Sequence, residues 1–217
     1  MLRAFKATAD SSYFHSASKA FDYYYGEFEE LGYTTAGALD TWCIDKESSM
    51  PLLRSALVLY DTTQEQAYIE KAEKISYYLS TWLWHYKAGY GADEDATRYG
   101  YNTFGATSVS TQHHHLDVYA LMWVSEWLRL AELSGNDVWR EKALAIWTNG
   151  CQILSDGTLE INGLIRPVGS QNEAFFECAW GGYPEKKRIN DWLVAWPGAF
   201  RLETMRNISD WGALDNE

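Results

Sequence analysis

The chain has 217 residues, of which 47% are hydrophobic and 22% charged, a composition typical of a folded single domain. Its net charge of −12, without a cluster of lysine or arginine, argues against nucleic acid as a partner, because binding a phosphate backbone requires basic side chains. The chain lacks a long uncharged apolar run and the apolar centre of a secretory signal near its start. We therefore expect no membrane partner and a cytoplasmic protein, either whole or as a fragment of a longer one.

The aromatic content is high, at 16% of the residues, with 11 Trp and 15 Tyr. A core built from wide side chains accounts for part of this number. The rest lies in glycine-rich stretches without helical periodicity, such as residues 85–105 and 177–184. Exposed rings beside polar groups favour a sugar-binding cleft, because the apolar face of a pyranose stacks on an aromatic ring.

The cysteines give no support for a disulfide or metal framework. Cys43, Cys151 and Cys178 are odd in number and lack CxxC spacing, which argues against both a disulfide scaffold and a zinc ribbon. We interpret them as small apolar residues and expect neither a metal nor another cofactor.

Helices are predicted in pairs along the chain. Residues 16–31 fit an outer helix, and residues 50–60 are apolar on nearly every face, as in a helix that is buried all round. Thr63 and Gln66 then form a capping-box pattern, which predicts a second helix from about residue 64. Its apolar positions recur at helical spacing opposite a charged face, so it is an outer helix.

The same order recurs about seventy residues later. Residues 59–75 align without gaps to residues 130–146, and each copy holds the end of one helix, a polar turn and the start of the next. Residues 116–130 form the second apolar inner helix, with a looser capping pattern at Ser134 and Asp137. A third inner helix is predicted over residues 192–205. Stacked pairs of this kind describe an all-α fold, an array of α/α-hairpins that closes into a toroid or runs on as a solenoid.

The connections between helices differ in length, and the long ones are candidates for function. The turns from inner to outer helix are short, whereas residues 87–115 and 155–190 link outer helices to the next inner helix. Loops of that length are uncommon in compact domains unless they bind or catalyse. Within the second, Asn162-Gly163 between alternating apolar residues predicts a small β-hairpin over residues 158–167 with a type I′ turn.

Three aspartates occupy matching places in the repeat. Asp45, Asp117 and Asp191 lie 72 and 74 residues apart, each shortly before an inner helix. The helix N-termini there favour ionised carboxylates. Each aspartate could instead be an ordinary N-cap. We expect further acidic, polar and aromatic side chains on the same rim, namely Trp42, Glu47, Tyr101, Gln112, His113, His114, His115, Glu173, Trp180 and Trp192.

The histidine triplet has more than one interpretation. At most two of three successive side chains can point the same way, so His113, His114 and His115 suit the lining of a pocket mouth. A zinc site is an alternative, but the strong spacing of two histidines four apart on a helix is absent. The histidines could also simply satisfy backbone groups where the helix starts. Nearby, Lys46 and Arg166 could pair with the carboxylate of a uronic sugar.

The clustering of acids on one rim favours a hydrolase. Paired carboxylates, one with its pKa raised by apolar and like-charged neighbours, perform glycoside hydrolysis, in which one acid protonates the leaving oxygen. We therefore expect a carbohydrate-active protein with an oligosaccharide or polysaccharide substrate.

Three stretches resemble a known superfamily. WCIDKESSMPLL, TSVSTQHHHLD and INDWLVAWPGAFRLE, together with the turn pattern L-x(5–7)-[YW]-x3-A, resemble the six-hairpin (α/α)6-toroid glycosidases. That superfamily includes unsaturated glucuronyl hydrolases, glucoamylase-like enzymes and relatives of helical polysaccharide lyases, and the resemblance covers most of residues 35–205. It implies that the acid and base are found among Asp45, Asp117, Glu173 and Asp191.

The length departs from that superfamily. A closed toroid of six hairpins needs on the order of 350 residues at this spacing, so this chain holds about three hairpins and resembles a C-terminal half. We expect a partial toroid that is completed by a missing N-terminal half or covered by a homodimer. Two other functions stay open: a polysaccharide lyase or epimerase using His114 and Tyr101, and a non-catalytic helical-repeat binding protein or inactive remnant.

Overall fold

The computed structural model describes residues 1–36, 43–111, 115–176, 188–190 and 192–214. These residues are mostly helical, with three small antiparallel sheets, which confirms the helix-rich class. The helices are α1 (Leu2–Thr8), α2 (Ser11–Leu31), α3 (Ser49–Thr63), α4 (Ala67–Ser80), α5 (Asp95–Arg98), η1 (Tyr119–Trp123), α6 (Val124–Ser134), α7 (Val138–Gly150), α8 (Trp196–Asn207) and η2 (Trp211–Leu214). The strands are β1 (Thr34–Ala36), β2 (Cys43–Asp45), β3 (Thr107–Ser108), β4 (Leu116–Asp117), β5 (Glu160–Ile161), β6 (Leu164–Ile165), β7 (Ala174–Phe176) and β8 (Arg188–Ile189).

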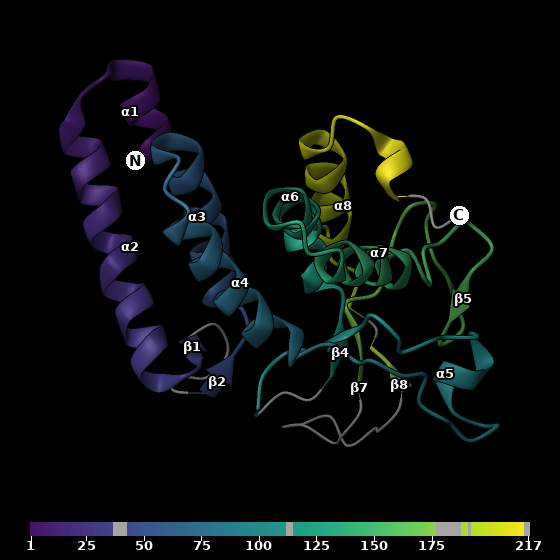
Figure 1. Ribbon diagram of the computed structural model, residues 1–217. Coiled ribbons are helices and arrows are strands. Elements are labelled where there is room, and N and C mark those ends of the chain that lie inside the picture. The colour runs from purple at the N-terminus through teal and green to yellow at the C-terminus, as the bar shows by residue number, and fades with distance from the viewer. Residues whose placement is uncertain (37–42, 112–114, 177–187, 191, 215–217) are drawn as a thin grey trace.

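The predicted repeat corresponds to two helical hairpins. Helix α3 packs against α4, and α6 packs against α7, while α3 and α6 also contact each other. Figure 1 shows α6, α7 and α8 grouped together, with α2, α3 and α4 beside one another and β2, β4, β7 and β8 near one end of the helices. In the part of the chain that the structure describes, no helix is long and apolar enough to cross a membrane.

The turns inside these hairpins differ from the predicted capping box. Thr63 and Ser134 are the last residues of α3 and α6, and the next residues, Gln64 and Gly135, adopt the left-handed conformation that ends a helix. The hydroxyls of Thr63 and Ser134 donate back to the carbonyls four residues earlier and accept the amide two residues later. The outer helices therefore begin at residues 67 and 138, three residues later than predicted.

Three other predicted boundaries move for local reasons. The apolar stretch 116–130 was predicted as one helix. It begins instead with the two residues of strand β4, continues as the 3-10 helix η1, and becomes α-helical only in α6. Helix α8 begins at Trp196 rather than 192, with Pro197 in its first turn, where the missing proline N–H costs nothing. Helix α2 begins earlier than the predicted residue 16, because the Asp10 side chain accepts the amide of Ser12 and caps it.

The predicted β-hairpin is confirmed. Strands β5 and β6 pair with Ile161 opposite Leu164, and Asn162 and Gly163 between them have φ of 52° and 78°. Two positive φ values in a two-residue loop are those of a type I′ turn, which matches the twist of the flanking strands.

A four-stranded sheet was not predicted. Its order is β3-β4-β7-β8, so it combines strands from both long connections. Each strand has only two or three residues, too few to show an alternating pattern in the sequence.

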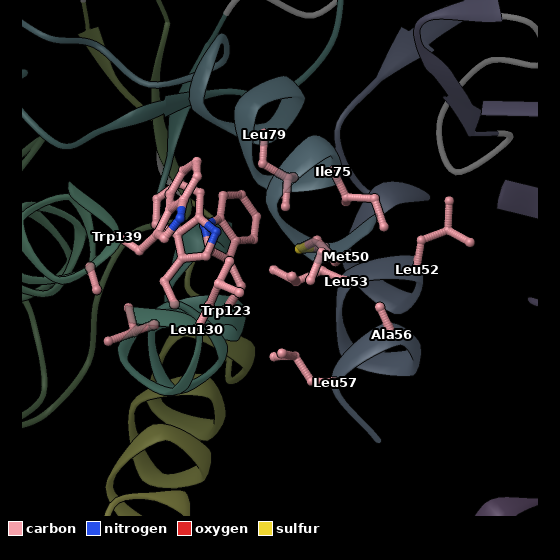
Figure 2. Packing of buried hydrophobic residues seen from close by; sticks show 14 of the residues in the cluster. Met50, Leu52, Leu53, Ala56, Leu57, Ile75, Leu79, Trp123, Leu130 and Trp139 are labelled. Atoms are coloured by element: carbon pink, nitrogen blue, oxygen red, sulfur yellow. The ribbon is translucent and has the colours of Figure 1, made fainter. Parts of the chain in front are cut away.

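The core lies between the two hairpins and is rich in tryptophan. Trp123, Trp127 and Trp139 are at most 1% exposed, and Trp127 contacts Trp123 edge-on and Trp139 in a tilted arrangement. Figure 2 shows Leu53 and Leu57 of α3 pointing toward this group. The Trp127 indole donates to Ser76 and the Trp139 indole to Glu73, so these two polar ring nitrogens are satisfied by the outer helix α4.

Truncation of Leu53, which is fully buried, tests this core. Leu53→Ala is expected to lower the free energy of unfolding by about 2–5 kcal/mol, because it removes buried methyl groups and leaves a cavity. Urea unfolding followed by tryptophan fluorescence measures the change. The control Leu202→Ala removes a leucine that is 69% exposed and should stay within about 0.5 kcal/mol of the parent. Equal losses would show that α3 is not packed as described.

Candidate functional site

The candidate site forms where the short strands meet the start of the inner helices. Asp45 ends β2, Asp117 ends β4, and Glu173 directly precedes β7. Asp117 lies opposite Thr107 on one side and opposite Ala174 on the other, and Asp45 forms an isolated bridge with Ser110. The four-stranded sheet and this isolated bridge thus bring together residues from three distant parts of the chain.

A buried ion pair connects the two copies of the repeat. Lys46 Nζ lies 2.7 Å from Asp117 Oδ2, and both side chains are fully buried. Lys46 also donates to the Ser108 carbonyl at 2.8 Å, and Asp117 Oδ1 accepts from the Thr107 hydroxyl at 2.6 Å. A buried charge pair is tolerated when further hydrogen bonds satisfy both partners, as they do here. Lys46 is therefore the ion-pair partner of Asp117 and is not exposed to bind a sugar carboxylate.

Asp45 and Asp117 make the same local contact, but neither is an N-cap. Asp45 Oδ1 accepts the Glu47 amide, and Asp117 Oδ1 accepts the Tyr119 amide at 3.1 Å, in both cases two residues on. The N-cap residues of the following helices are Ser48 and Val118. The N-cap interpretation of these two aspartates is therefore wrong, and their shared register comes from an Asx turn ahead of each helix.

Glu47 has the most altered acidity in the site. It is half-buried, and its pKa is raised from 4.5 to about 7. The largest cause is the loss of solvent; the negative charges of Asp45, Asp117 and Glu173 add to it, and the positive charge of Lys46 opposes it. At neutral pH this carboxyl group is therefore partly protonated and can donate a proton.

Glu173 is the second half-buried acid. Burial and the charge of Asp117 raise its pKa, and a hydrogen bond from the Trp196 side chain opposes that rise. Its backbone amide donates to the Trp192 carbonyl at 3.0 Å, which fixes the start of β7. Because Glu173 contributes to the raised pKa of Glu47, the two carboxyl groups act within one electrostatic site.

Aromatic rings lie beside these acids. Tyr119 stacks on Trp196 with ring centroids 4.1 Å apart, and Phe200 packs against both. Lys46 Nζ lies 5.6 Å from the Tyr119 ring centre. Burial and the charges of Glu47, Asp117, Glu173 and Asp45 raise the pKa of Tyr119, so its hydroxyl stays neutral. The side chains of Tyr119 and Trp196 are half-buried, so part of each ring surface is exposed to solvent.

Several predicted site residues lie elsewhere. Tyr101 is buried in a second apolar cluster, stacked on Phe175 and donating to Asn149. Arg166 is buried in the β5–β6 hairpin and donates to the Ile161 carbonyl. His115 is buried beside β4, with its carbonyl accepting from Val109. Trp192 is half-buried next to Glu173.

Six predicted residues lie outside the described residues. They are Trp42, Gln112, His113, His114, Trp180 and Asp191. Within the described ranges, no group of three or more His, Cys, Asp or Glu side chains is placed to hold a metal ion.

Sequence reasoning missed the roles of Tyr119 and Trp196 and the partner of Lys46. The signal for Lys46 was its position between two acids in the stretch IDKES, because a lysine there lies close to negative charge whatever the fold. No local signal identified Asp117 as its partner, 71 residues away.

A separate groove of about 950 Å³ lies between α1, α2, α3 and α8. Its lining is largely apolar, with Phe21, Leu52 and Val58 among its residues, and includes none of Asp45, Glu47, Asp117 or Glu173. Chemistry at the acids therefore does not take place in this groove.

Comparison with known proteins adds no family assignment: a scan against protein-family models and a search of curated proteins both found no match to the chain.

The ion pair makes a stability prediction. Lys46→Met leaves Asp117 buried without its partner and should cost about 3–5 kcal/mol, whereas adding Asp117→Leu should recover most of that loss. Chemical denaturation of both variants measures this. The control Lys74→Met breaks a pair whose side chains are 62% and 55% exposed and should leave the stability close to that of the parent, because water screens such a pair. A double variant as unstable as the single one would contradict the pairing.

The raised pKa of Glu47 predicts a pH dependence of stability. The folded state holds the Glu47 proton more tightly than the unfolded state, so stability should fall as pH rises from 4.5 to about 7 and stay level above. Glu47→Gln removes this fall and should be more stable than the parent at pH 8 by roughly 1–2 kcal/mol after allowance for solvent screening. Unfolding curves from pH 4.5 to 8 measure the difference. A variant that tracks the parent at every pH would show that Glu47 titrates normally.

Proposed function

We propose that the chain carries a glycoside hydrolase-type site in which Glu47 is the general acid and Glu173 is the second carboxylate. The observation that carries this proposal is the raised pKa of Glu47, to about 7, in a cluster with Glu173 and beside open aromatic rings. Glycoside hydrolysis needs one carboxyl group that is protonated at working pH and one that is ionised.

The environments of the acids support different roles. Glu47 and Glu173 are half-buried, so both can reach a ligand, whereas Asp45 and Asp117 are 2% and 1% exposed. Asp117 is held by Lys46 and Thr107, and Asp45 by the Glu47 amide. The two aspartates are therefore positioning residues whose charges raise the pKa of Glu47.

In the proposed reaction, Glu47 gives its proton to the glycosidic oxygen as the bond from that oxygen to the anomeric carbon breaks. Glu173 then either takes a proton from the attacking water or attacks the anomeric carbon itself, the two routes open to paired carboxylates. The half-buried Tyr119 and Trp196 offer apolar ring surface to the sugar.

The architecture belongs to the same proposal. Helices α3, η1 with α6, and α8 are successive inner helices that contact one another in turn, and α4 and α7 cover them. This order is what part of an (α/α)6 toroid would have, with the acids at the inner-helix N-termini. A further half or a second copy would complete such a ring.

The lyase alternative has weaker support. Its candidate tyrosine, Tyr101, is 6% exposed, stacks on Phe175 and donates to Asn149, so its hydroxyl is part of a core. The alternative of a non-catalytic binding protein is tested by the same kinetics as the hydrolase.

Leaving-group kinetics test the role of Glu47. Glu47→Gln should lower kcat/KM by about 10²–10⁴ for alkyl glycosides, whose leaving oxygen needs a proton. It should keep activity within about tenfold of the parent for 2,4-dinitrophenyl glycosides, which leave without a proton. Glu173→Ala should lose both activities and regain the second with azide. The control Glu70→Gln changes an exposed acid on α4 and should match the parent. Equal loss on both leaving groups, or a parent without activity on any glycoside, would reject the proposal.

A further inference from the structure

Two buried carboxamides have side-chain atoms without a hydrogen-bond partner in the described part of the chain. Asn190 is 3% exposed, and neither its side-chain nitrogen nor its oxygen has a partner in the described part of the chain. Asn172 is 4% exposed; its Nδ2 donates to the Asn190 carbonyl, but its Oδ1 has no partner among the described residues. Buried polar groups are nearly always paired, and an unpaired one weakens the fold. A buried carboxamide that weakens the fold is expected to have another role, such as ligand binding.

The sheet register places Asn190 on the face that carries Asp117. Thr107 lies opposite Asp117, and Asp117 lies opposite Ala174. Phe175 lies opposite Ile189, so Asn190, the next residue, falls across from Ala174. Residues directly opposite in antiparallel strands project from the same face, as the hydrogen bond between Thr107 and Asp117 shows. Asn172 directly precedes Glu173 in the sequence and is joined to Asn190 by its hydrogen bond to the Asn190 carbonyl.

The charges around this face disfavour an anionic ligand. Asp45, Glu47, Asp117 and Glu173 share one electrostatic site with Lys46, which is fully buried against Asp117. Arg166 is buried in the β5–β6 hairpin. Among the described residues, Arg188 is exposed on β8, two residues before Asn190, and is a cation that a uronate could use. A carboxamide differs from all of these groups because it both donates and accepts hydrogen bonds without charge.

We propose that Asn190, with Asn172 behind it, hydrogen-bonds hydroxyl groups of an uncharged sugar ring, so that the site takes neutral glycosides and rejects uronides. This inference rests on the proposed function and names its substrate class. A hydroxyl group matches a carboxamide because each can donate and accept. Rotation of the Asn190 side chain presents it to the ligand, the kind of side-chain change that is common on binding. The bound sugar then supplies the missing partners.

Binding and stability are measured together, without relying on turnover. Isothermal titration of the full chain with methyl glucoside, methyl galactoside and their uronate counterparts should detect the neutral member of each pair at least about tenfold more tightly. Asn190→Ala should weaken neutral binding by about five- to thirtyfold through the lost hydrogen bonds. The same variant should melt at or above the temperature of the parent, because an unpaired buried amide is removed.

Two variants serve as controls. Asn136→Ala removes a carboxamide that bonds Glu73 on the outer turn and should leave sugar binding unchanged. Arg188→Gln should also leave neutral binding unchanged, because the neutral ligand does not use it.

The outcomes separate this inference from the proposed function. Neutral binding without hydrolysis of any glycoside supports the inference and rejects the hydrolase. Tighter uronate binding that Arg188→Gln abolishes overturns the inference and leaves the hydrolase standing. Binding of neither class overturns the inference, as does an Asn190→Ala variant that melts lower than the parent with unchanged affinity, since Asn190 would then be structural.

Discussion

The buried contact between Lys46 and Asp117 is the constraint on which the candidate site depends. It joins residues from the two copies of the repeat at 2.7 Å, with both side chains fully removed from water. An isolated charge could not remain there, because desolvation of an unpaired ion is far more unfavourable than desolvation of a pair. The remaining hydrogen bonds to Ser108 and Thr107 hold the pair against β3. Each partner therefore fixes the place of the other and of its strand.

Glu47 and Glu173 take their positions from that pair. Glu47 directly follows Lys46 in the sequence, and Glu173 directly precedes Ala174, which lies opposite Asp117. Once Lys46 and Asp117 meet, the neighbouring acids share a small volume. The result is a division by environment: two aspartates are buried and hydrogen-bonded, while two glutamates are half-buried with raised pKa values. Chemically similar groups thus receive different properties from their surroundings.

The carboxamides of Asn190 and Asn172, which lack some of their hydrogen-bond partners among the described residues, fit the same pattern. A region of the fold that supports binding often keeps polar groups that stability alone would not retain. Here the buried ion pair has all its partners while the nearby amides do not. This contrast separates the groups that hold the site together from the carboxamides that we propose bind a ligand.

The sequence by itself determined the helical hairpins, their repeat and the β5–β6 hairpin, because each depends on near neighbours in the chain. Helical spacing of apolar residues marked α3, α4, α6 and α7, and Asn162-Gly163 specified the turn. It also placed Asp45 and Asp117 ahead of inner helices. Its errors within the helical hairpins were at boundaries, where a left-handed residue such as Gln64 ends one helix before the next begins.

Only the tertiary structure decided which residues form the site. Tyr101 and Arg166 have the chemistry of site residues but are buried in other contacts, whereas Tyr119 and Trp196 lie beside the acids. The pairing of β4 with β7 joins residues 57 and 59 positions apart, and the partnership of Lys46 with Asp117 joins residues 71 positions apart. No local periodicity encodes such contacts, because they arise from the packing of one hairpin against another and from the need of a buried charge for its counterion.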